Sequence, residues 1–242
     1  MNNNNNNLND ANENNVEASN SSASGQNTMD ALSQYFKSAA STREGRAIPP
    51  LDKWHPTEVV DMDLIIKANG EWWHEGTQMT RESLANLFAT ILWKEDNNNQ
   101  TEYFLKTPAQ KIRIQVEDVP LFINDVGIVH ENEVSWLEFT TTTGDVVRLD
   151  NEHPIMLKAY HSADNEAVAK PNMEATTKTD QTSKTAEHIR PYMSVRNGLT
   201  ALIGRNTFYH LTEIGQLTEE NDETILTLQS GGQSYSISMS SD

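Results

Sequence analysis

Residues 62–75 read MDLIIKANGEWWHE, and this stretch decides which fold the sequence predicts. Its first six residues form a mostly apolar run that predicts a strand. Asn69 and Gly70 then predict a hairpin turn, because both central residues of a type I′ turn need a positive φ. The remaining residues return as the partner strand. The body of the chain is therefore expected to open with a β-hairpin.

An amphipathic helix is expected next, over residues 81–93. Its apolar positions follow the spacing i, i+3, i+4, i+7 and i+8 from Leu84 to Leu92, which places them on one face of a helix. Thr80 is suited to cap its start. Two more strands follow before residue 118, so the first unit is predicted to have the order β-β-α-β-β.

The same order of elements is predicted again in the second half of the chain. Asn197 and Gly198 predict a second hairpin turn, a helix is expected to begin near Arg205, and two more strands pair across Gly231 and Gly232. An arginine followed by apolar residues at three-residue intervals opens both predicted helices. We therefore predict an α+β fold of two small, related β-β-α-β-β domains with mostly antiparallel sheet, which arose by internal duplication.

The composition divides the chain into folded and polar parts. Residues 1–47 are rich in Asn and poor in apolar side chains, so we predict a disordered tail. A long polar stretch at about 161–188 predicts a disordered insertion. The rest is expected to form an N-terminal α+β domain over 48–118 and a C-terminal α+β domain over 119–242.

The charge and the residue types exclude several functions. The 35 acidic and 18 basic side chains give a net charge of −17, which argues against nucleic-acid binding because contacts to phosphate need Lys and Arg. The chain has no cysteine, which excludes disulfides, thiol nucleophiles and thiolate-ligated zinc. It also lacks a long apolar run and a secretory signal. We expect a cytoplasmic protein that does not associate with membranes.

Several motifs of the chain resemble a proteobacterial family of proteins of unknown function. They are PLxxWHP at 50–56, NGxWxxxG at 69–76, RxxLxxLF at 81–88, YFLxTP at 103–108, VEDVP at 116–120, PY at 191–192, RxGLxALI at 196–203 and FY at 208–209. The resemblance covers about residues 48–160 and 189–240. It implies a two-domain α+β protein with repeated structural motifs, for which a role in signal transduction or ligand sensing has been suggested. It implies no catalytic residues.

Six residues are candidates for ligand binding: Trp72, Trp73, Arg81, Arg196, Arg205 and Tyr209. Adjacent tryptophans on a strand point to opposite faces, so one of the two needs a second layer, a domain interface or a ligand. Arg81 and Arg205 start the predicted helices, where the helix dipole disfavours a cation unless it helps to hold an anion. Arg196 lies beside the second turn and can join such a site. The alternative is that each arginine pairs with an Asp or Glu.

These residues favour a non-catalytic ligand-binding or interaction protein with a small anionic ligand in a groove between its two domains. Two alternatives stay open. One is a hydrolase-like enzyme that uses His55, His74 or His153 with Glu117 or Asp118, and the other is an acidic scaffold for a basic protein partner. We assign no catalytic residue, metal ligand or cofactor, because no motif for these is present.

Overall fold

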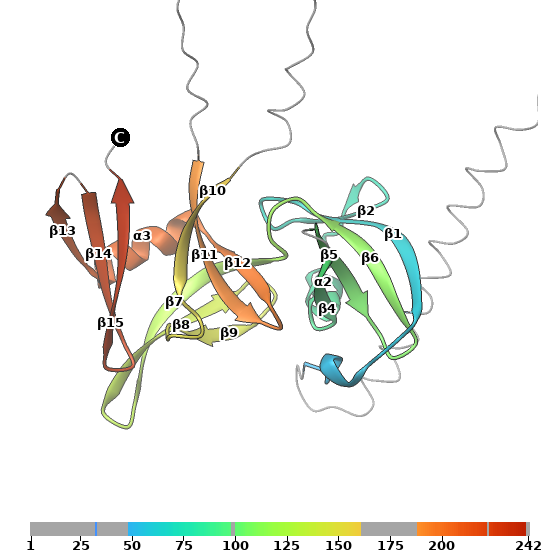
Figure 1. The fold of residues 1–242 in the computed structure, drawn as a ribbon, viewed down its shortest axis with the longest axis horizontal. Coiled ribbons are helices and arrows are strands. Elements are labelled where there is room, and N and C mark those ends of the chain that lie inside the picture. Colours follow the sequence, from blue (N-terminus) through green and yellow to red (C-terminus); the bar gives the residue numbers. More distant parts are fainter. Residues whose placement is uncertain (1–31, 33–47, 98–99, 161–187, 222, 241–242) are drawn as a thin grey trace, which may run out of the picture. The chain divides into compact units, whose positions relative to one another are not determined.

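The structure is mostly β. The computed structural model describes residue 32 and residues 48–97, 100–160, 188–221 and 223–240 (Figure 1). From residue 48 onward, the described residues form fifteen strands in three sheets and two α-helices. The predicted α+β fold is therefore wrong. The predicted tail, apart from Leu32, and most of the predicted insertion lie outside the described residues.

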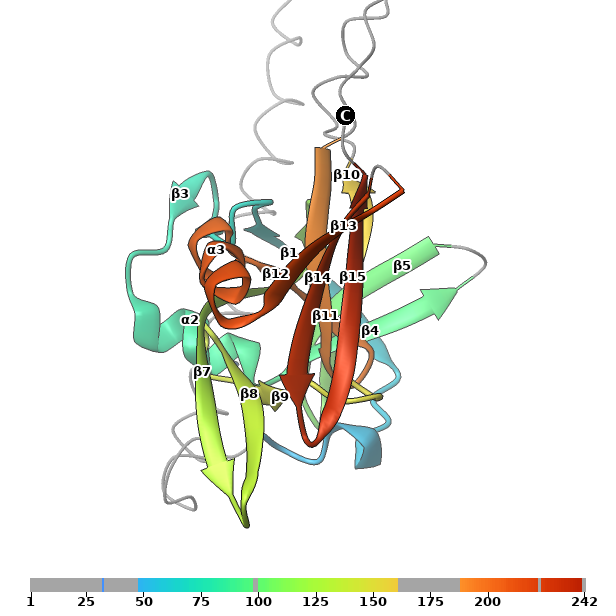
Figure 2. The ribbon, with the colours of Figure 1, turned by 90° about the vertical axis from the view of Figure 1, so that its left-hand side faces the viewer.

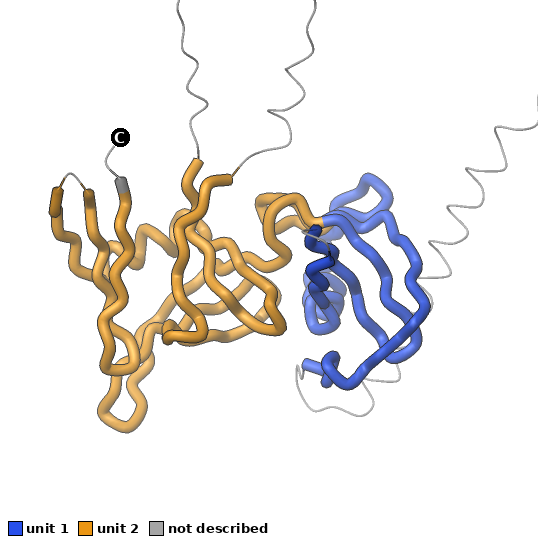
Figure 3. Tube along the Cα trace, in the orientation of Figure 1, with its two compact units in different colours: residues 1–65, 73–115 blue, residues 66–72, 116–242 orange. Residues whose placement is uncertain are grey.

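The chain divides into two compact units (Figure 3). Unit 1 contains residues 1–65 and 73–115, and unit 2 contains residues 66–72 and 116–242. Residues 66–72 thus belong to unit 2 although unit 1 surrounds them in the sequence. The chain consequently passes between the two units three times.

Unit 1 is built on a six-stranded sheet with the order β3-β2-β1-β6-β5-β4. Its strands are β1 (Glu58–Ile66), β2 (Trp72–His74), β3 (Thr77–Gln78), β4 (Leu92–Asn97), β5 (Gln100–Lys106) and β6 (Gln110–Val116). A short 3₁₀-helix, Leu51–Lys53, precedes β1, and helix α2 (Glu82–Ala89) lies between β3 and β4. The helix buries Ala85, Phe88 and Ala89.

Helix α2 is shorter than predicted. The backbone N–H groups of Thr90 and Ile91 donate to Leu87 and Phe88, which closes the helix with tight turns. The carbonyl of Ile91 then accepts the N–H of Lys106 at 2.8 Å, so the chain joins the sheet. The apolar pattern of the sequence continues beyond the end of the helix. It does so because Ile91 and the first residue of β4 are buried in the sheet region and not on the helix.

Unit 2 contains a six-stranded sheet with the order β10-β11-β12-β7-β8-β9. Its strands are β7 (Leu121–Glu131), β8 (Val134–Thr141), β9 (Val146–Arg148), β10 (Ile155–Tyr160), β11 (His188–Arg196) and β12 (Leu199–Ile203). Strands β12 and β7 are parallel, whereas the neighbouring pairs are antiparallel. Asn197 and Gly198 both have positive φ, as expected for the turn between β11 and β12.

Helix α3 (Arg205–Ile214) leads from β12 into a three-stranded antiparallel sheet (Figures 1 and 2). This second sheet of unit 2 consists of β13 (Gln216–Glu220), β14 (Glu223–Ser230) and β15 (Gln233–Ser240). The buried hydroxyl of Ser230 donates to the carbonyl of Leu149 at 2.7 Å and accepts the N–H of Leu137 at 3.1 Å. These bonds join the end of β14 to the six-stranded sheet.

The predicted internal duplication is wrong. Helix α2 follows β3, an edge strand of its sheet, whereas α3 follows β12, a central strand. The first predicted turn also differs from the second, because Gly70 has a positive φ and Asn69 does not. Similar local signals therefore open two units of different topology, and Arg81 and Arg205 do not hold equivalent positions.

Candidate functional site

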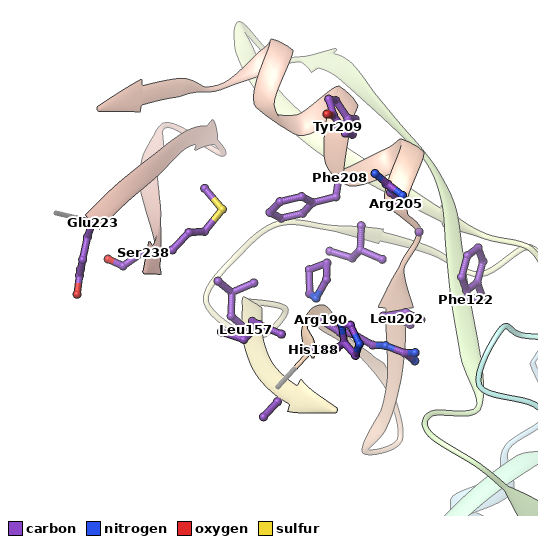
Figure 4. Close-up of a pocket in the computed structure, with 16 residues that line it drawn as sticks. Phe122, Leu157, His188, Arg190, Leu202, Arg205, Phe208, Tyr209, Glu223 and Ser238 are labelled. Atoms are coloured by element: carbon purple, nitrogen blue, oxygen red, sulfur yellow. The ribbon is translucent and has the colours of Figure 1, made fainter. Parts of the chain in front are cut away.

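An open groove of about 860 Å³ lies within unit 2 (Figure 4). Strands β10, β11 and β12, helix α3 and strand β15 all contribute side chains to it. Its volume falls within the usual range for small-molecule sites, roughly 300–1,000 Å³. We therefore treat this groove as the candidate functional site.

A strip of the sheet side of the groove is apolar. Leu157 and Ala159 of β10 line it, and so do Ile189 and Pro191 of β11. The register pairs Leu157 with Pro191 and Ala159 with Ile189, so the four side chains share one face of the sheet. Ile189 is 57% exposed, which makes this strip of the sheet accessible to a ligand.

Helix α3 forms another wall of the groove. Arg205, Phe208 and Tyr209 line it, and their spacing of i, i+3 and i+4 places them on one side of the helix (Figure 4). The opposite side buries Thr207 and Leu211. Arg205 is exposed, and within the described part of the chain its guanidinium takes part in no ion pair or hydrogen bond.

A polar cluster holds Arg190, which also lines the groove. A guanidinium nitrogen of Arg190 donates to Asp118 at 2.9 Å, and the group lies 3.4 Å from the ring centroid of Tyr160. The hydroxyl of Tyr192 donates to the same carboxylate at 3.0 Å. Burial, together with the hydrogen bond to Asp118, raises the pKa of Tyr192 above its usual range. Asp118 therefore neutralises the charge of Arg190.

Sequence reasoning missed this cluster. It considered Asp118 only as a partner for a catalytic histidine and gave Arg190 no role. Arg190 and Tyr192 are two residues apart on β11, and this spacing places both on the same face of a strand. The alternation could therefore have shown that they share surroundings, but it could not have shown that Asp118 lies beside them.

Two of the six predicted ligand-binding residues lie at the groove. Arg205 and Tyr209 line the groove. Arg196 instead donates to Asp145 at 2.8 Å in an ion pair whose side chains are 15% and 5% exposed. Trp72 is buried in unit 2 and does not line the groove, whereas Trp73 and Arg81 belong to unit 1.

Two of the residues proposed for a hydrolase, Glu117 and His74, have other partners. Glu117 accepts the ammonium of Lys67 at 2.6 Å and the N–H of Ala68 at 3.0 Å, and the bond from Lys67 lowers the pKa of the glutamate. Nδ1 of His74 lies 2.8 Å from the carbonyl oxygen of Asp63.

His153 does have a carboxylate partner, Asp150, at 2.9 Å. The same oxygen of Asp150 accepts the backbone N–H groups of Glu152 and His153, which is the bonding of a closed turn. In the part of the chain that the structure describes, no three metal-ligating side chains come together and no helix is long and apolar enough to cross a membrane.

Comparisons with known proteins place the chain in a family. The family described as "Domain of unknown function (DUF1285), N-terminal domain" matches residues 49–119, and the one described as "Protein of unknown function (DUF1285), C-terminal domain" matches residues 164–237. No curated protein matches the chain.

Two crystal structures of DUF1285 family proteins are similar to it. The protein from Silicibacter pomeroyi DSS-3 is 26% identical with a TM-score of 0.60, over 83% of this chain and 93% of the other. The protein from Shewanella baltica OS155 is 27% identical with a TM-score of 0.40, over 62% and 90%. The chain therefore belongs to the DUF1285 family of two-domain proteins of unknown function.

Proposed function

We propose that this protein binds a small organic anion in the groove of unit 2, and that binding is its activity. The sequence led us to expect the ligand between the two domains, but the groove that supports the proposal lies within unit 2. A sensing role in the cytoplasm, as the family resemblance and the composition suggest, belongs to the same proposal.

Arg205 is the observation that carries the proposal. Acidic side chains outnumber basic ones by 35 to 18, so most arginines can find a carboxylate. In unit 2, Arg148, Arg190 and Arg196 all form ion pairs. Arg205 has no such partner among the described residues, although it lines a groove of suitable size. A carboxylate or phosphate of a ligand can accept hydrogen bonds from the guanidinium of Arg205.

The proposal is tested by calorimetric titration with three organic anions of different shape: benzoate, octanoate and adenosine monophosphate. We expect at least one to bind, and Arg205→Gln to weaken that binding about fivefold, which corresponds to roughly 1 kcal/mol for an ion pair at an exposed site.

Arg81→Gln is the matched control. Arg81 is also an exposed arginine at the start of a helix and has no ion pair among the described residues, but it belongs to unit 1. It should leave the affinity unchanged. Equal losses in the two variants, or no binding of any anion, would show that the groove is not an anion site.

A further inference from the structure

We propose that the ligand of the groove is an amphipathic carboxylate, with its charged end at Arg205 and an unbranched hydrocarbon body along the apolar strip of β10 and β11. This inference rests on the proposed function and narrows the class of ligand. It follows from where the charged and apolar side chains of the lining point.

Strands β10 and β11 of the six-stranded sheet present their apolar lining residues on one face of that sheet. Ile189 and Pro191 alternate with His188 and Arg190 along β11, so these two apolar side chains lie on the face opposite to His188 and Arg190. Arg190 is also neutralised by Asp118. Arg205 of α3 is therefore the lining arginine that has no carboxylate partner among the described residues.

In the three-stranded sheet, the carboxylate of Glu223 lies on the face that points away from the ligand. Leu226 pairs with Ile237, and both are buried, so this face of the sheet is the inner one. Met239 is two residues beyond Ile237 and shares the inner face. Ser238 and Glu223 lie on the other face, because Ser238 pairs with Ile225 and Glu223 is two residues from Ile225.

Among the described residues, the groove thus offers one arginine without an ion pair beside an apolar strip. Glu223 and Ser238 lie at the far side of the groove from Arg205 (Figure 4). Between these sides the lining includes the apolar side chains of Leu157, Ile189 and Phe208. Arg190 also lines the groove, but its charge is paired with Asp118. A ligand with one anionic group and a hydrocarbon body matches this distribution, whereas a second charged group on the ligand would meet apolar side chains.

A homologous series of probes tests the inference. Straight-chain carboxylates from butanoate to dodecanoate are titrated below their micellar concentrations, beside the primary alcohols of the same lengths. We expect each added CH₂ to lower the dissociation constant about two- to fourfold until the groove is filled. A roughly fourfold decrease corresponds to full burial of the added CH₂. Arg205→Gln should weaken all carboxylates by a similar factor and leave the alcohols unchanged.

A matched pair of variants locates the hydrocarbon chain. Ile189 lines the groove and is 57% exposed, whereas Val146 of β9 in the same sheet is 58% exposed and does not line it. Ile189→Asn should flatten the dependence on chain length, and Val146→Asn should preserve it. Equal effects of the two substitutions would overturn the inference.

The outcomes separate the two proposals. If carboxylates bind with dependence on Arg205 but with the same affinity at every chain length, the anion site stands and the amphipathic ligand is wrong. If no carboxylate binds and the other anions also fail, both proposals fall. If affinity rises with chain length equally in carboxylates and alcohols and Arg205→Gln has no effect, the groove is apolar and the anionic end is wrong.

Discussion

At the residue scale, Asp118 shows how one side chain settles the roles of its neighbours. Its carboxylate has a side-chain exposure of 10% and accepts hydrogen bonds from both Arg190 and Tyr192. A partly buried carboxylate with two donors stabilises the fold, because its removal leaves a guanidinium without its counter-charge. The same pairing also leaves Arg205, and not Arg190, as the cation available to a ligand.

Asp118→Ala should lower the free energy of unfolding by about 2 kcal/mol, less than the loss for a fully buried pair because Arg190 is partly exposed. Denaturant unfolding at neutral pH measures the loss. Glu131→Ala is the control, since it removes an ion pair with Arg148 whose side chains are 34% and 52% exposed, and it should cost less than about 1 kcal/mol. Losses of equal size would show that the Asp118 cluster contributes no more than a surface pair.

At the element scale, the end of β14 attaches the three-stranded sheet to the six-stranded sheet. Besides the two hydrogen bonds of Ser230, the N–H of Gly231 donates to the carbonyl of Ser135 at 2.9 Å. Gly231 has a φ of +61°, and a Cβ there would lie 2.5 Å from the ring of Trp136. This turn is therefore tied to β8 by both hydrogen bonds and close packing.

Ser230→Ala should lower the free energy of unfolding by about 2 kcal/mol, because it leaves a buried N–H and a buried carbonyl without their partner. Ser234→Ala is the matched control on the neighbouring strand, where the hydroxyl bonds to the exposed side chain of Gln229. That change should stay within about 0.5 kcal/mol. Thermal unfolding of both variants makes the comparison, and the attachment argument fails if the two melt together.

The elements also show which features a sequence can predict. The start of α3 and the Asn197–Gly198 turn depend on local preferences and were predicted at their observed positions. The parallel pairing of β12 with β7 joins segments about eighty residues apart, and no local pattern records it. For the same reason Arg205 could be chosen as a candidate from its place on a helix, whereas Leu157 and Ile189 could not be recognised as its neighbours.

At the scale of the whole molecule, Leu32 is the one described residue of the predicted N-terminal tail. It lies within the segment whose composition predicts disorder, yet it is helical and 1% exposed. Composition averages over many residues, so it cannot detect one apolar side chain that finds a buried place. The N-terminal segment therefore contributes at least one residue to the core.

A chain that starts at residue 48 should have a free energy of unfolding about 2 kcal/mol lower than the full chain, because it loses the burial of a leucine side chain. A chain that starts at residue 30 keeps Leu32 and should match the full chain. Leu32→Ala in the full chain should reproduce most of the loss. If both truncated chains are as stable as the full chain in denaturant unfolding, Leu32 adds nothing to stability.

The three passages of the chain between its units have a consequence for inheritance. Residues 66–72 belong to unit 2 but are encoded inside the segment that encodes unit 1. No single break in the gene can separate the units, because each break leaves one of them without part of its own structure. We therefore expect the two units to be inherited together, because a single exchange between genes would leave one unit incomplete.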